Sequence, residues 1–220
     1  MKKRIAGKFY AALVLLALFA LWTAAVRVVD LQPIGPEGSV VGLAGINGAF
    51  HRLTDVHMGL YTLTDWLGLV PLVFVLGFAM LGLVQWVKRK SLLKVDTGIF
   101  LLGGFYVVTL AAYLLFEEIV VNYRPVLIDG FLEASYPSST TLLVMCVMPT
   151  AAKQLALRIK KPAFRRWIVA GIWGFVAFMV AGRLLSGVHW LTDIIGGALL
   201  SAGLVMLYDA ALAATEGTRG

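Results

Sequence analysis

Apolar residues along this chain come in long continuous runs rather than in the alternating pattern of half-buried strands. Most of these runs are close to the length of about 20 residues that a helix needs to cross the hydrocarbon core of a bilayer, and the last one is short unless it extends back to Trp190 across Asp193. The uncharged runs cover residues 9–26, 67–87, 97–116, 134–152, 167–182 and 194–208. We expect transmembrane spans at approximately residues 9–29, 67–87, 97–121, 136–156, 167–185 and 190–210. The pattern therefore predicts an all-α fold, a bundle of six transmembrane helices forming one integral-membrane domain over residues 1–220.

The composition agrees with this interpretation. Of the 220 residues, 60% are hydrophobic and 14% are charged, whereas soluble domains average about 45–50% and about 25%. A soluble globule of this size could not bury so much apolar surface. The same values exclude a disordered chain, and the single cysteine, Cys146, excludes a disulfide scaffold.

The distribution of basic residues predicts the orientation in the membrane. The chain carries 19 basic and 12 acidic residues, a formal net charge of +7. If the N-terminus lies inside, only Arg27, Arg52, Arg124 and Arg183 fall on the outer side. Since cytoplasmic loops carry an excess of Lys and Arg, both termini are expected in the cytoplasm. The positive charge is thus assigned to topology and not to nucleic-acid binding, and the short loops favour a bacterial plasma membrane.

One outer connection is long. Residues 30–65 are rich in glycine and proline, and we expect an interfacial helix around residues 51–61. His51 and His57 in this segment are predicted to face water.

The most informative polar residues lie where the last span begins. His189 and Asp193 are four residues apart, so on a helix they would share one face. A carboxylate that accepts one imidazole N–H fixes the tautomer and raises the basicity of the other nitrogen, which suits attack on an electrophile. Arg183 precedes this pair, and its planar fork matches the oxygens of a phosphate.

Two further groups are predicted at the same outer end. Ser138, after Pro137, is a candidate N-cap for the fourth span, and the free N–H groups of the first turn would attract an anion. Arg124 is held in extended geometry by the proline that follows it. Two arginines, a helix start and a His–Asp pair on one side of a membrane fit phosphoryl transfer, where catalysis is mainly positioning and charge neutralisation.

The chain at this point resembles the type 2 phosphatidic acid phosphatase superfamily of six-helix, metal-independent lipid phosphatases. That family has the signatures Lys-x6-Arg-Pro, Pro-Ser-Gly-His and Ser-Arg-x5-His-x3-Asp. The third appears here as Gly182-Arg183-x5-His189-x3-Asp193, with only the leading serine changed. The resemblance implies a nucleophilic His189 that forms a phosphohistidine, oriented by Asp193. It also implies an active site without a metal or other cofactor, and the predicted orientation places that site on the extracytoplasmic side. The phosphate-binding residues would be Arg124, Arg183, Ser138, Ser139 and Thr140.

Two positions depart from the family pattern. Glu117 stands seven residues before Arg124, where the family has a lysine, and Thr140 stands where the family has the histidine that protonates the leaving group. A threonine hydroxyl cannot act as that general acid. Glu117 or Glu118 could act as the acid if partial burial keeps it protonated, and His51 or His57 could approach from the outer loop.

Three functions remain open from the sequence: a hydrolase for a phosphatidate or polyprenyl diphosphate, a lipid phosphotransferase using the same histidine, and an inactive relative that binds a lipid phosphate. We expect the hydrolase, because keeping four polar site residues at membrane depth is costly in a mere scaffold. Arg124, Arg183, His189 and the helix start at Ser138–Thr140 should lie within reach of one phosphate. Glu117 should border this pocket, about two helical turns from Arg124.

Overall fold

The computed structural model describes residues 2–217, and this part of the chain is helical without named strands. Six helices or helix pairs in it are long and apolar enough to cross a membrane, as expected. The helices are α1 (Lys2–Val28), α2 (Ala44–Thr54), α3 (Met58–Leu67), α4 (Leu69–Arg89), α5 (Thr97–Glu118), α6 (Ser139–Arg158), α7 (Pro162–Leu185) and α8 (Leu191–Gly217), with short 3-10 turns at Pro36–Gly38 and Leu92–Lys94. The six-helix, all-α architecture is therefore confirmed.

The second long helix begins earlier than the sequence pattern predicts. α3 and α4 meet at Gly68 and together make a stretch of 32 residues, Met58–Arg89, whereas the expected span began at residue 67. The uncharged run ended there because Asp65 interrupts it. A helix of this length exceeds the roughly 20 residues that a bilayer core requires, so the polar α3 end can extend beyond the hydrocarbon.

The remaining helix ends also differ from the expected spans, by amounts that local signals explain. α5 ends at Glu118, three residues before the expected end at residue 121. α6 begins at Ser139 and not at residue 136, because Pro137 and the N-cap Ser138 precede it. α7 already begins at Pro162, where a proline fits the first helical position. The first and last helices are longer than the expected 9–29 and 190–210.

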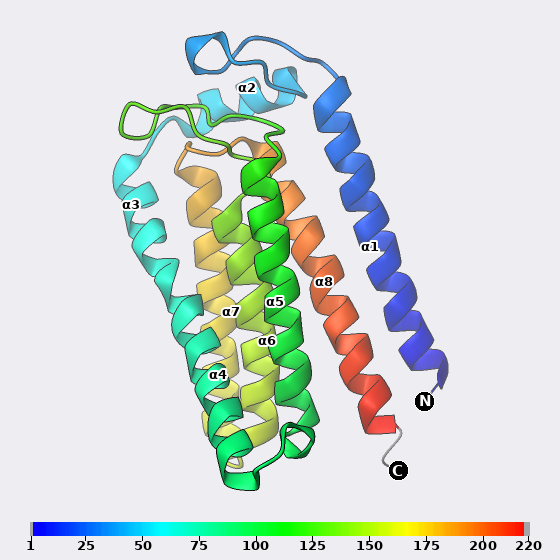
Figure 1. The fold of residues 1–220 in the computed structure, drawn as a ribbon. Coiled ribbons are helices and arrows are strands. Elements are labelled where there is room, and N and C mark those ends of the chain that lie inside the picture. The colour runs from blue at the N-terminus through cyan, green and yellow to red at the C-terminus, as the bar shows by residue number, and fades with distance from the viewer. Residues whose placement is uncertain (1, 218–220) are drawn as a thin grey trace.

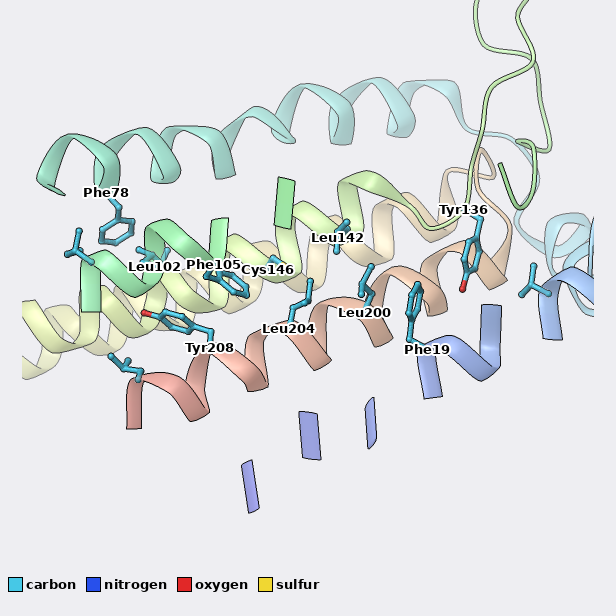
Figure 2. Packing of buried hydrophobic residues seen from close by; sticks show 14 residues of the cluster. Phe19, Phe78, Leu102, Phe105, Tyr136, Leu142, Cys146, Leu200, Leu204 and Tyr208 are labelled. Carbon is cyan, nitrogen blue, oxygen red and sulfur yellow. The ribbon is translucent and has the colours of Figure 1, made fainter. Parts of the chain in front are cut away.

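The core packs α8 between α1 on one side and α5 and α6 on the other (Figure 1). Leu200, Leu204 and Tyr208 of α8 pack against side chains from α1, α5 and α6 (Figure 2). Tyr136 lies at the end of this cluster that is nearest the start of α8, and its ring stacks on Phe19 of α1 with centroids 6.4 Å apart. A Cβ atom on Gly196 would lie only 2.6 Å from the Tyr136 ring, so a glycine is needed at this contact. This packing holds the start of α8 against the loop that precedes α6.

The two long connections, residues 29–57 and 119–138, lie at one end of the bundle, opposite the start of α1 and the end of α8 (Figure 1). α2 crosses this loop-covered end. The single helix expected around residues 51–61 is wrong, since α2 ends at Thr54 and α3 starts at Met58. The break falls at Asp55, whose φ of 54° is incompatible with a continuous helix.

Candidate active site

His189 lies in the turn between α7 and α8 and not on a helix. The helical spacing argument for its proximity to Asp193 is therefore wrong, although the two residues do meet. Asp193 is the third residue of α8, and its Oδ2 accepts the backbone N–H of Trp190 at 2.8 Å. An acidic side chain that reaches back to the residue before a helix is one half of a capping box. The cap is what turns the carboxylate toward the histidine.

The histidine and the aspartate are both fully enclosed. His189 is 3% exposed and Asp193 is 0% exposed. Nδ1 of His189 lies 3.6 Å from Oδ2 of Asp193, which is longer than a hydrogen bond. The predicted pairing is therefore present as a close contact, and a shift of less than 1 Å would bring it to hydrogen-bond length.

Two arginines converge on the other nitrogen of the same imidazole. Nη1 of Arg124 lies 3.1 Å from Nε2 of His189, and Nη2 of Arg183 lies 3.5 Å from it. Both guanidinium groups are buried. Because a guanidinium can only donate, Nε2 must accept and the ring proton belongs on Nδ1. The arrangement presents the lone pair of Nε2 to the space between the two cations.

The environment keeps this imidazole neutral. Burial, and then the positive charges of Arg124 and Arg183, hold the pKa of His189 well below its usual range, while the nearby Ser135 carbonyl acts in the opposite direction. A neutral imidazole can attack a phosphorus atom, whereas an imidazolium cannot.

Arg124 reaches the site from an irregular hairpin and not from α5. Tyr123 and Ala134 form an isolated antiparallel bridge, and the N–H of Arg124 donates to the carbonyl of Glu133 at 3.0 Å. Nε of Arg124 lies 3.0 Å from Oε2 of Glu133, which is partly exposed. The expectation that Arg124 sits two helical turns after Glu117 is wrong, because α5 ends at Glu118 and the chain then leaves the helix.

Arg183 is held from the α3 side. Its Nη1 lies 3.5 Å from Oδ1 of Asp65, and its guanidinium carbon lies 4.7 Å from the centroid of the Tyr61 ring. The guanidinium carbon of Arg124 lies 5.9 Å from the same ring. Sequence reasoning missed Tyr61 and Asp65. The only sequence feature that could have indicated these two residues was the charge of Asp65 at the edge of an apolar run.

The N-terminus of α6 lies beside these groups. Ser138 is the N-cap, as expected, and its Oγ accepts from the backbone N–H of Thr141 at 3.4 Å. The N–H of Ser138 donates to the carbonyl of Asp193 at 3.1 Å. Both groups are thus engaged within the protein. The N–H groups of Ser139 and Thr140 occupy first-turn positions that have no intrahelical acceptor.

Ser139 and Thr140 face different surroundings. Ser139 lines a small cavity together with His189 and Glu117, so Glu117 does border the site. The other lining residues are Tyr113, Phe116, Ala134, Ser135, Tyr136, Pro137 and Leu142. The methyl group of Thr140 instead lies 3.7 Å from the position that a Cβ atom on Gly68 would take, at the junction of α3 and α4.

The two histidines of the outer loop differ in exposure. Nε2 of His51 lies 3.1 Å from the carbonyl of Gly187, and its ring packs on Trp190 with centroids 5.4 Å apart. His51 is therefore half-buried, and the expectation that it faces water is wrong. His57 is exposed, as expected, and its backbone N–H donates to Ser186. His51 supports the turn that carries His189.

Long-range hydrogen bonds tie the surrounding loops to the start of α8. Asn47 of α2 donates to Thr192 Oγ1 at 3.0 Å and accepts the Thr192 N–H at 3.2 Å. Nε1 of Trp190 donates to the carbonyl of Tyr123 at 2.7 Å. Trp22 of α1 donates to the carbonyl of Thr192 at 3.2 Å. Within residues 2–217, no group of three His, Cys, Asp or Glu side chains is arranged to hold a metal ion.

Comparisons with known proteins bear on this arrangement. The family model described as the PAP2 superfamily matches residues 103–212, half of the chain, and includes His189, Asp193 and both site arginines. A comparison with curated protein sequences finds no match. Among solved structures, the fold is similar to that of the first transmembrane PAP2 type phosphatidylglycerolphosphate phosphatase from Bacillus subtilis, with a TM-score of 0.59 and 16% sequence identity. The similarity covers 91% of this chain and 94% of that chain.

Proposed function

The chain belongs to the PAP2 superfamily and is an integral membrane protein, and from this we propose that it is a lipid phosphate phosphatase. The observation that carries the proposal is the convergence of Arg124 and Arg183 on Nε2 of His189. Two fixed cations beside a neutral imidazole nitrogen suit a phosphoryl group better than any other common lipid substituent. The similar structure from Bacillus subtilis is that of a phosphatidylglycerolphosphate phosphatase, which is consistent with a substrate of the same class for this chain.

In the proposed reaction, Arg124, Arg183 and the N–H groups of Ser139 and Thr140 hold the phosphate oxygens. Nε2 of His189 attacks phosphorus, the bond to the leaving oxygen breaks, and a phosphohistidine forms. The proton on Nδ1 remains directed toward the Asp193 carboxylate, which stabilises the positive charge that develops on the ring. Water then attacks the phosphohistidine and releases inorganic phosphate. The proposed steps use side chains and backbone N–H groups of this chain and include no metal ion or other cofactor.

We place the active site on the extracytoplasmic side, with both chain termini in the cytoplasm. The support is the charge pattern, because the loop-covered end carries few basic residues while residues 88–94 and 153–166 at the other end are rich in them. A phosphorylated lipid in the outer leaflet would reach His189 from the membrane plane.

The test is phosphate release by purified protein in detergent. The substrates are phosphatidate, phosphatidylglycerolphosphate and undecaprenyl diphosphate, and the comparison variant is His189→Ala. We expect His189→Ala to lose at least about 10³-fold in rate, the scale seen when a catalytic nucleophile is removed. His57→Ala is the matched control, since His57 is an exposed histidine at the same end, and it should keep full activity.

The same experiment separates the alternatives. Equal background release by the wild type and His189→Ala would contradict a hydrolase and leave a protein that only binds a lipid phosphate. Acid-labile phosphate that accumulates on His189 without release to water would instead indicate transfer to another acceptor. Release from one of the three substrates well above the others would identify the headgroup class.

A further inference from the structure

Tyr61 on α3 is in contact with both arginines of the site. Its ring centroid lies 4.7 Å from the guanidinium carbon of Arg183 and 5.9 Å from that of Arg124. Both guanidinium groups also touch Nε2 of His189. Tyr61 therefore packs against both of the groups that are proposed to hold the phosphate. A cation–π contact needs only one cation, whereas the Tyr61 ring contacts two.

The position of Tyr61 matters because phosphoryl transfer is approximately in line. The leaving oxygen must lie on the far side of the phosphorus from Nε2 of His189. Nε2 points toward the two arginines, and Tyr61 packs against the same two groups. A phosphate held by the two guanidinium groups would therefore have the Tyr61 ring as a neighbour on its α3 side.

Thr140 also lies next to the α3–α4 segment. Its methyl group lies 3.7 Å from the position that a Cβ atom on Gly68 would take, and Gly68 is seven residues after Tyr61, about two helical turns or roughly 10 Å further along. Glu117 approaches His189 from α5 instead, through the cavity that it shares with His189 and Ser139, and Tyr61 is not among the residues that line this cavity. Asp65 lies beside Tyr61, but its carboxylate faces Arg183 as an ion pair at 3.5 Å and so acts as an acceptor.

We propose that Tyr61 is the proton donor for the leaving group, the part that Thr140 cannot perform; this proposal rests on the proposed phosphatase function. As Nε2 of His189 attacks and the bond from phosphorus to the leaving oxygen breaks, the phenolic O–H passes its proton to that oxygen and the lipid alcohol departs. The phenolate that remains is stabilised by the charges of Arg124 and Arg183. It recovers a proton from the water that hydrolyses the phosphohistidine, so the protein ends unchanged.

The test compares Tyr61→Phe with the wild type on substrates whose leaving groups differ. The phenylalanine keeps the ring against both arginines and removes only the O–H. Phosphatidate, whose alkoxide leaving group needs a proton, should lose about 10²–10³-fold in kcat. p-Nitrophenyl phosphate, whose leaving group departs without protonation, should lose less than about fivefold, since general acid catalysis contributes little to it. Tyr10→Phe, at a tyrosine that is 74% exposed on α1, is the matched control and should change neither rate.

Glu117→Gln is run in parallel because Glu117 is the rival donor. A loss confined to phosphatidate in Glu117→Gln, with Tyr61→Phe unaffected, would overturn the proposal in favour of Glu117. An equal loss on both substrates in Tyr61→Phe would also overturn it and reduce Tyr61 to a residue that positions the arginines. Failure of the phosphatase function itself is recognised separately, because wild type and His189→Ala would then hydrolyse every substrate equally.

Discussion

Arg124 donates from Nη1 to Nε2 of His189 over 3.1 Å, although 65 residues separate them in the chain. The hairpin of residues 122–135 carries the arginine, and the turn after α7 carries the histidine. The contact brings a fixed positive charge to the proposed nucleophile before any substrate arrives. Its main electrostatic consequence is that protonation of the imidazole becomes unfavourable.

The first prediction concerns pH. Because burial and the two arginine charges lower the pKa of His189, the acid limb of kcat/KM should have its midpoint below 6.5, the ordinary histidine value. Removing one cation in Arg124→Gln should raise the pKa of His189. The midpoint of the acid limb of the residual activity should therefore lie at a higher pH than in the wild type. The pH profile of kcat/KM measures this shift, and Arg52→Gln in the exposed part of α2 should leave it unchanged. A limb that stays in place in Arg124→Gln would contradict the electrostatic account.

The second prediction concerns Gly187, in the turn that carries His189. Its φ is +69°, and a Cβ atom there would lie 1.9 Å from the carbonyl oxygen of Asp55. The methyl group added in Gly187→Ala would therefore push the backbone at Asp55 away from the turn that carries His189. We expect a loss of about 3 kcal/mol in the free energy of unfolding and a loss of most of the activity.

Gly130 provides the matched control for that substitution. It also has a positive φ, +83°, but a Cβ atom there would have no neighbour within 4 Å. Gly130→Ala should cost only the backbone strain, about 1 kcal/mol. Thermal unfolding in detergent compares the two variants. Equal destabilisation would show that the contact with Asp55 does not matter.

The third prediction separates charge from geometry at Arg183. Arg183→Lys keeps the positive charge but loses the planar fork that reaches both His189 and Tyr61. We expect kcat/KM to fall by about 10²-fold, since one preorganised charge-stabilising donor contributes on that scale. Arg27→Lys, at an exposed arginine near the end of α1, should retain wild-type kinetics. Full activity of Arg183→Lys would mean that only the net charge is needed.

The fourth prediction concerns Glu117, which replaces a cation of the family signature and lines the cavity beside His189. Its negative charge should weaken the binding of phosphate, so Glu117→Lys should lower the inhibition constant of inorganic phosphate by about tenfold or more. Glu118→Lys adds the same charge one residue further along, at a side chain outside the cavity lining, and should have a much smaller effect. Competitive inhibition by phosphate distinguishes the two variants, and equal effects would indicate a general electrostatic influence.

Much of the fold could be predicted because it depends on local properties. A continuous apolar run specifies a membrane helix whatever its neighbours are, and the Pro137–Ser138 pair predicts the start of α6 through its own capping chemistry. The ends of the membrane helices were less predictable where a polar residue interrupts an apolar run. Asp65 ended the predicted second span, yet the helix continues through it, and its partly exposed carboxylate lies 3.5 Å from Nη1 of Arg183.

The candidate site divides in the same way. The sequence by itself determined that His189, Asp193, Arg183 and Arg124 are out of place in an apolar chain and that a helix start lies nearby. Only the tertiary structure decided that Tyr61 lies against both arginines, that Glu117 reaches the cavity from α5 and that Arg124 arrives on a hairpin. These placements depend on contacts between segments far apart in the chain, and no periodicity or capping signal within one segment encodes which distant residue it will meet.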